Sequence, residues 1–177
     1  MMFFTPFARR RSALPARFRR PRLLIIGCGD IGLRVQRLAP ATAVVRGRVY
    51  ALTSSPKRLP LLRAAGITPL LGNLDQPPSL RRLAGLATHV LHLAPPPTQG
   101  EQDPRTLALA RSLRRGRLPR ALVYASTSGV YGDCAGAWVA ETRPVAPATA
   151  RAQRRIAAEK LLRQGMGRAG VRVSILR

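Results

Sequence analysis

Short apolar runs alternate with longer amphipathic stretches along most of this chain. Nearly every position of the short runs is apolar, which is typical of strands buried on both faces of a parallel sheet. These runs are 22–26, 49–53, 67–71, 89–93, 121–125 and 171–176. Helical patterns separate them at 31–38, 57–65, 79–84, 104–115 and 150–165.

This alternation predicts an α/β fold with a doubly wound parallel sheet. Right-handed crossovers between about six strands give the order 3-2-1-4-5-6. Two helix ends carry their own signals. Asp103 is placed to cap the helix that begins at Pro104, and Gly66 is placed to end the helix predicted at 57–65.

The first strand runs into a glycine-rich turn, Gly27-x-Gly29-x-x-Gly32, and then into a helical pattern. Gly27 permits a tight turn, Gly29 lets the backbone approach a pyrophosphate, and Gly32 lets the helix pack close to the strand. Asp30 and Ile31 begin the helix, whose free N–H groups face the phosphates. This context predicts a Rossmann dinucleotide site rather than a purely structural turn.

The end of the second strand indicates which dinucleotide binds. NAD-binding sites usually carry an acidic residue here, about 20 positions after the glycine turn, for the ribose 2′-hydroxyl. The sequence offers no carboxylate there, and its hydroxyls and cations favour a 2′-phosphate, with Arg34 as a further cation. NADP is therefore expected and NAD is the alternative, with Thr53, Ser54 and Arg58 as the binding residues and Lys57 beside them.

Composition limits the class of protein. The 177 residues suffice for one domain, and 46% hydrophobic content indicates a globular fold. The longest apolar runs are too short to span a membrane, and two cysteines do not suggest a disulfide framework, which favours the cytoplasm.

The formal charge of +24 comes almost entirely from arginines scattered through the chain. Such a charge attracts polyanions, but aromatic residues make up only 5% of the chain and do not interleave with the cations. A basic nucleic-acid-associated protein is therefore kept only as a third hypothesis, and nucleic acid is not expected as the main partner. Residues 1–21 contain arginines and no acid, and they are predicted to form a disordered basic arm outside the domain at 22–177.

Five further motifs follow the glycine turn in a fixed order. They are Leu71-Gly72-Asn73-Leu74, His92-Leu93-Ala94, Tyr124-Ala125-Ser126-Thr127-Ser128-Gly129-Val130-Tyr131-Gly132, Glu141-Thr142-x-Pro144-x-x-Pro147 and Ala157-Ala158-Glu159-Lys160. In this order they resemble the extended, atypical branch of the short-chain dehydrogenase/reductase superfamily, the NAD-dependent epimerase/dehydratase group. The resemblance implies an oxidoreductase or epimerase acting on a carbonyl or sugar-nucleotide substrate. It adds Asn73, Leu74, Leu93 and Ala94 to the cofactor-binding residues.

The same resemblance implies chemistry by a Ser/Thr, a Tyr and a Lys. Thr127 stands at the Ser/Thr position, but Arg151 stands where the tyrosine belongs and Arg155 where the lysine belongs. Arginine does not deprotonate, so Arg151 cannot exchange the proton. Thr127 and Arg155 remain the catalytic candidates, with Arg155 supplying fixed charge near the ribose. A catalytically silent NADP-binding sensor or scaffold is the second hypothesis.

Other chemistry-bearing residues carry less weight. His89 and His92 are expected to pack or to form local hydrogen bonds, Tyr131 to belong to a structural turn, and no metal site is expected. Relatives in the family continue into a C-terminal substrate region, so a truncated chain is expected. A homodimer is left open.

Overall fold

The computed structural model describes residues 20–38 and 47–177. Most of the predicted basic arm, residues 1–19, therefore lies outside the described residues. The strands are β1 (Arg22–Ile26), β2 (Arg48–Thr53), β3 (Thr68–Leu71), β4 (His89–His92), β5 (Ala121–Ala125) and β6 (Arg172–Leu176). The α-helices are α2 (Asp30–Leu38), α3 (Leu59–Ala64), α4 (Pro104–Leu113) and α5 (Ala150–Leu161).

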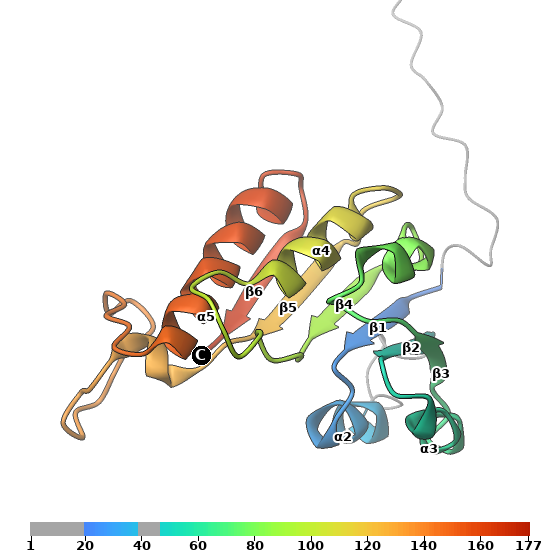
Figure 1. Cartoon of the computed structure of the whole chain (residues 1–177), viewed down its shortest axis with the longest axis horizontal. Coiled ribbons are helices and arrows are strands. Elements are labelled where there is room, and N and C mark those ends of the chain that lie inside the picture. The colour runs from blue at the N-terminus through green and yellow to red at the C-terminus, as the bar shows by residue number, and fades with distance from the viewer. Residues whose placement is uncertain (1–19, 39–46) are drawn as a thin grey trace, which may run out of the picture.

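The strands form one six-stranded sheet in the order β3-β2-β1-β4-β5-β6, and every pairing is parallel. This confirms the predicted strand order and fold class. Figure 1 shows the strands running side by side, with all their carboxyl ends at one edge of the sheet. We call this the carboxyl edge and the opposite one the amino edge.

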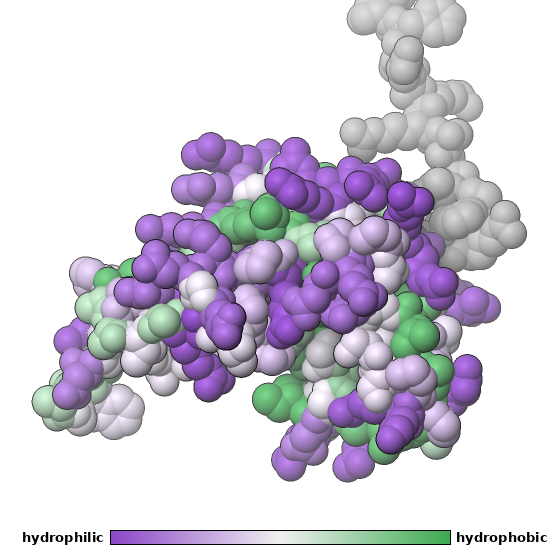
Figure 2. Space-filling view, viewed as in Figure 1, coloured by the Kyte–Doolittle hydropathy of each residue, from purple (hydrophilic) through white to green (hydrophobic). Residues whose placement is uncertain are grey.

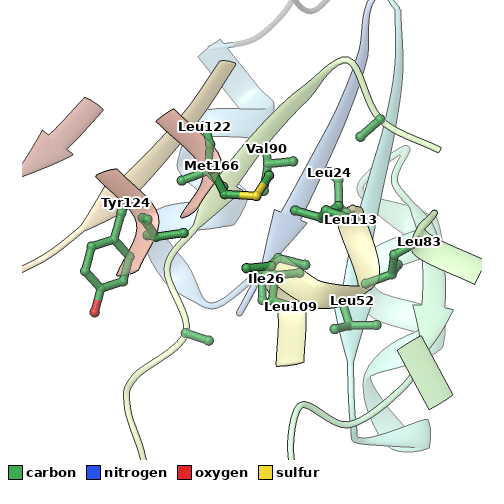
Figure 3. Packing of buried hydrophobic residues seen from close by; sticks show 14 of the residues in the cluster. Leu24, Ile26, Leu52, Leu83, Val90, Leu109, Leu113, Leu122, Tyr124 and Met166 are labelled. Atoms are coloured by element: carbon green, nitrogen blue, oxygen red, sulfur yellow. The ribbon is translucent and has the colours of Figure 1, made fainter. Parts of the chain in front are cut away.

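Alternate residues of β1 bury opposite faces of the sheet, because successive side chains of a strand point to opposite sides. Leu24 and Ile26 join the larger core cluster, which α4 and α5 cover. Leu23 and Ile25 join the smaller cluster, which α2 and α3 cover. Figure 3 shows Leu24 and Ile26 packed near Leu109 and Leu113 of α4.

Three predicted helices differ from the observed elements. The segment predicted at 79–84 is a 3-10 helix, Pro77–Leu83, because two prolines at its start restrict the backbone and remove N–H donors. The segment predicted at 57–65 begins as a 3-10 helix at Pro56–Arg58 and becomes α3. The helix predicted at 150–165 continues beyond α5 as a π-helix, Leu162–Gly167.

Both predicted helix-end signals are confirmed. The Asp103 carboxylate accepts a hydrogen bond from the Thr106 N–H at 3.0 Å and caps α4. Gly66, just beyond α3, has a φ of +74°, a value that glycine adopts without steric cost.

Candidate functional site

A cleft of about 420 Å³ opens at the carboxyl edge beside β1 and β4. The chain leaves these two neighbouring strands toward opposite faces of the sheet. Doubly wound sheets bind ligands at this change in strand order. Eight of the predicted cofactor residues line the cleft: Gly27, Gly29, Thr53, Ser54, Arg58, Asn73, Leu74 and Ala94. The structure therefore brings together residues from four separate strand ends.

The glycine turn forms one wall of the cleft. Gly27 has a φ of +78°, and an added Cβ would lie 2.6 Å from the backbone nitrogen of Ala94. The backbones of β1 and β4 thus approach each other more closely at this point than any side chain allows. At Gly29 an added Cβ would meet no atom within 4 Å, so its open side is free for a ligand.

Gly32 lies inside the protein, as predicted. Its α-carbon faces Cys28, and an added Cβ would lie 2.9 Å from the Cys28 Sγ. Burial raises the pKa of the Cys28 thiol, which keeps it protonated at neutral pH. Cys28 therefore packs against Gly32 of α2.

α2 begins directly after the part of the glycine turn that lines the cleft, and the first N–H groups of a helix have no partner within it. The side chains of the first turn of α2 do not line the cleft. Asp30 forms an exposed ion pair with Arg34 at 2.8 Å, and the Ile31 side chain is exposed. Asp30, Ile31 and Gly32 thus remain predicted to contribute only through the backbone.

The connection after β2 carries hydroxyls and a guanidinium into the cleft. Thr53 Oγ1 accepts a hydrogen bond from the Ser55 N–H at 3.2 Å and shapes this turn. Arg58 donates from Nη2 to the Cys28 carbonyl oxygen at 2.8 Å, which joins the β2 connection to the glycine turn. This contact holds the Arg58 guanidinium at the cleft wall.

An ion pair on the far wall is a feature that the sequence patterns did not predict. Arg105, in the first turn of α4, donates from Nε and Nη2 to the two carboxylate oxygens of Asp75, both at 2.7 Å. Both residues line the cleft. Asp75 lies in the connection after β3, and Arg105 is the second residue of α4. No local sequence pattern predicts a contact between two residues 30 positions apart.

Asn73, Leu74 and Ala94 line the cleft at the ends of β3 and β4. Asn73 Oδ1 accepts a hydrogen bond from the Asp75 N–H at 3.0 Å. Leu93 does not line the cleft; its N–H donates to the Ile26 carbonyl oxygen at 2.8 Å and its side chain packs against the smaller core cluster.

The two catalytic candidates lie beside β5 and do not line the cleft. Thr127 Oγ1 accepts a hydrogen bond from the Gly129 N–H at 3.3 Å. Arg155 is only 6% exposed and donates from Nη1 to the Ala125 carbonyl oxygen at 2.7 Å and to the Tyr124 hydroxyl at 3.0 Å. Arg151 lies exposed in the first turn of α5.

Both histidines form local hydrogen bonds, as expected. His89 Nδ1 lies 2.9 Å from Thr88 Oγ1. His92 Nε2 lies 2.9 Å from Thr106 Oγ1, whose proton goes to Asp103 Oδ2 at 2.7 Å. His92 therefore donates from Nε2. Burial and the Arg155 charge lower the pKa of His92 to about 3, which keeps the imidazole neutral.

A second polar group joins the ends of β5 and β6. Glu159 is buried and forms an ion pair with Arg177 at 2.7 Å, and it accepts a hydrogen bond from Ser126 Oγ at 2.6 Å. Arg177 also donates to the Tyr131 hydroxyl at 3.1 Å. These contacts agree with the structural role expected of Tyr131.

Comparison with known proteins supports the same fold. No family model and no curated protein matches the chain. A conserved protein of unknown function from Silicibacter pomeroyi DSS is 29% identical, with a TM-score of 0.65 over 89% of this chain and 51% of that one. A UDP-glucuronic acid 4-epimerase from Bacillus cereus, solved with UDP-glucuronic acid and NAD, is 20% identical, with a TM-score of 0.69 over 88% and 55% of the two chains.

A short-chain dehydrogenase/reductase superfamily protein from Agrobacterium tumefaciens, solved with bound NAD, is 21% identical, with a TM-score of 0.68 over 88% of this chain and 48% of that one. The chain shares the fold of these structures, as the resemblance found in the sequence implies. The chain spans about half the length of each of these three proteins.

A membrane-spanning helix and a group of metal-binding side chains would each bear on function. Within residues 20–38 and 47–177, no helix is long and apolar enough to cross a membrane. The same residues include no cluster of three or more His, Cys, Asp or Glu side chains suited to a metal ion.

Proposed function

We propose that this chain binds NADP in the carboxyl-edge cleft and acts as an oxidoreductase or epimerase of the short-chain dehydrogenase/reductase type. The observation that carries the proposal is the open side of Gly29 beside the start of α2. A bare backbone at the amino end of a helix is suited to a diphosphate. The NAD-bound structures of similar fold support the same class of cofactor.

The residues present fit such a cofactor along the length of the cleft. Gly29 and the first-turn N–H groups of α2 would hold the diphosphate. Asn73 and Leu74 lie on the side expected to hold the adenine. When bound, the nicotinamide exchanges a hydride with a substrate carbon.

The preference for NADP rests on the connection after β2. Thr53, Ser54 and Arg58 line the cleft there, and the connection has no carboxylate. A guanidinium matches phosphate oxygens in geometry and charge, whereas a ribose hydroxyl is usually bound by an acid. Asp75 also lines the cleft, but both of its carboxylate oxygens are bonded to Arg105.

The substrate is proposed to be a carbonyl compound or a sugar nucleotide. The Thr127 hydroxyl follows β5 and would donate a hydrogen bond to the substrate oxygen. Arg155 would act on the ribose side through its fixed charge, although it already donates to the Tyr124 hydroxyl and to the backbone of β5.

A second candidate function is a catalytically silent NADP-binding sensor or scaffold. A specific observation favours it: Arg151 stands where the resemblance implies the proton-exchanging tyrosine, and arginine does not give up its proton near neutral pH. Under this alternative the cleft binds the cofactor and no hydride is transferred.

Titration of the purified chain with NADPH and NADH tests the proposed cofactor. NADPH is expected to bind at least about 10-fold more tightly, because Arg58 adds a charged contact to the 2′-phosphate. Ser54→Asp is expected to reverse this preference by repelling the 2′-phosphate and accepting from a 2′-hydroxyl. Ser174→Asp adds the same charge on exposed β6 and serves as the matched control.

Equal affinity for the two cofactors in the parent chain would contradict the NADP proposal. Absence of binding to either one would contradict the cofactor site itself. Turnover on a panel of carbonyl and sugar-nucleotide substrates then separates the enzyme from the silent sensor.

A further inference from the structure

Acidic residues occupy only one end of this molecule. The chain has seven, and six of them lie between the carboxyl end of a strand and the first turn of a helix that follows it. The seventh, Glu159, lies in α5 but bonds to Ser126 and Arg177, just beyond β5 and β6. All of them therefore belong to the carboxyl edge: Asp30, Asp75, Glu101, Asp103, Asp133, Glu141 and Glu159.

The acids at this edge neutralise cations beside them. Among the described residues, three ion pairs are formed, Arg34 with Asp30, Arg105 with Asp75, and Arg177 with Glu159. All three lie at the carboxyl edge. The cofactor cleft thus opens in a region of mixed charge.

The amino edge carries arginines and no acid. Six of them gather where the connections into β5 and β6 end, and all six are exposed. We call this set the amino-edge rim, and it consists of Arg114, Arg115, Arg117, Arg120, Arg168 and Arg172. Figure 2 shows hydrophilic side chains gathered along the upper margin, over the ends of α4 and α5 from which these connections run.

Backbone contacts hold the rim together. The Arg172 N–H donates to the Arg120 carbonyl oxygen at 3.0 Å, so the starts of β5 and β6 are adjacent. Arg114 donates from Nη1 to the Gly165 carbonyl oxygen at 3.2 Å, which links the end of α4 to the π-helix. These two contacts join the connection into β5 to the connection into β6, so the arginines of both lie on the same side of the molecule.

The rim charges also act on a neighbouring strand. Burial lowers the pKa of His89, and the charges of Arg120 and Arg172 lower it further. Two arginines from different connections thus act together on the start of β4. No acid is present to offset them.

Helix dipoles do not account for this concentration of charge. The carboxyl end of a helix bears about half a negative charge, which one cation satisfies. Three arginines nevertheless follow α4 within residues 114–117. A general excess of arginine does not explain it either, because that would not confine every acid to the opposite edge.

We propose that the amino-edge rim binds the phosphate backbone of nucleic acid without regard to sequence. Guanidinium groups pair with phosphate oxygens through two parallel hydrogen bonds, and such contacts supply most non-specific affinity for nucleic acid. Among the described residues, none of the exposed large apolar side chains lies within 114–120 or 168–172. A membrane surface is therefore the less favoured partner, because the rim has nothing to insert into it.

This surface is independent of the proposed cofactor site, since it lies at the opposite end of the strands. The rim also differs from an RNA-recognition surface, because it has no aromatic side chains on which bases stack. Sequence-independent binding with a strong dependence on salt is expected.

The test measures binding of the full chain to a fluorescent 20-base-pair DNA duplex by anisotropy at several salt concentrations. The rim variant combines Arg117→Gln, Arg120→Gln and Arg172→Gln. The matched control combines Arg37→Gln, Arg63→Gln and Arg143→Gln, which removes the same charge from exposed positions outside both the rim and the cofactor cleft. Circular dichroism confirms that both variants fold.

The rim variant is expected to bind the duplex at least 10-fold more weakly than the control variant. The slope of log K against log salt is expected to fall by about 0.9 for each phosphate that the variant no longer neutralises. NADPH affinity is expected to be the same in both variants. Equal weakening of DNA binding in the two variants would overturn the proposal, as would tighter binding to vesicles of anionic lipid than to the duplex.

Discussion

Gly27 and Gly29 belong to one turn, but a side chain would meet different surroundings at the two positions. Gly27 faces the backbone of Ala94 and has a positive φ, so its constraint comes from the fold. Gly29 faces open space, so its constraint comes from the ligand proposed to lie there. Substitution at the two positions should therefore separate stability from affinity.

Gly27→Ala is expected to lower the free energy of unfolding by about 1–3 kcal/mol, because the left-handed backbone is strained for alanine and the new Cβ meets backbone atoms. Gly29→Ala is expected to leave stability within about 0.5 kcal/mol. Gly29→Leu is expected to weaken NADPH binding at least 10-fold by filling the phosphate position. Denaturant unfolding and NADPH titration measure the two effects, and the same decrease in stability at both positions would refute this assignment.

His92 couples the stability of the fold to pH. The imidazole is 1% exposed, and its pKa is lowered to about 3 from an ordinary value near 6.5. The unfolded chain therefore binds a proton that the folded chain rejects. The stabilisation is complete above pH 6.5 and disappears as the pH falls from 6.5 toward 3.

Between pH 6.5 and pH 5, His92 is expected to lower the unfolding free energy by up to about 1.4 kcal/mol per pH unit. His92→Asn is expected to remove that contribution, which unfolding at several pH values would show. His89→Asn is the control, because the pKa of half-buried His89 is lowered in the same direction but its ring is more accessible. A parent chain and His92→Asn variant with the same pH dependence would contradict the role of His92.

At the scale of elements, side-chain caps fix where the two long helices begin. Asp103 caps α4, and Thr149 caps α5 by accepting from the Ala152 N–H at 3.2 Å. The two caps differ in their surroundings. Asp103 is buried and also accepts a hydrogen bond from the Thr106 hydroxyl, whereas Thr149 is exposed.

Asp103→Ala is expected to lower the unfolding free energy by about 2–4 kcal/mol, because it removes the cap and leaves the Thr106 hydroxyl without its buried acceptor. Thr149→Ala should lower it by about 1 kcal/mol, the ordinary value for a cap. Thermal or denaturant unfolding compares the two. A larger decrease for Thr149→Ala would show that burial of Asp103 contributes nothing.

At the scale of the whole molecule, cofactor binding should increase the free energy of unfolding. A ligand that binds only the folded chain at 100 times its Kd adds about 2.7 kcal/mol. For a chain of this length this corresponds to a rise in Tm of roughly 5–11 °C. NADPH at a fixed concentration is expected to raise Tm more than NADH does, and the Gly29→Leu variant is expected to show little change with either.

The cofactor cleft and the amino-edge rim lie at opposite ends of the strands, because all strands of the sheet run in the same direction. Parallel strands collect the glycine turn and every acid at the carboxyl edge, and they leave the rim arginines at the amino edge. Changes at one end should therefore add to changes at the other without coupling, since distant sites contribute independently.

The order of short apolar runs and amphipathic stretches by itself determined the fold, because a parallel sheet has few connections that bury both of its faces. The spacing of the glycines likewise located the turn, because only glycine permits a φ of +78° against the backbone of Ala94. The apolar spacing at 79–84 predicted a helix but not its type, because Pro77 and Pro78 begin the segment and it folds as a 3-10 helix.

Only the tertiary structure decided which distant residues meet. The pairing of Asp75 with Arg105 and the burial of Arg155 against Tyr124 join residues about 30 positions apart. The segregation of acids from the rim also depends on the direction in which every strand runs. Local sequence patterns carry no information about such contacts, because packing of the whole sheet brings the participating atoms together.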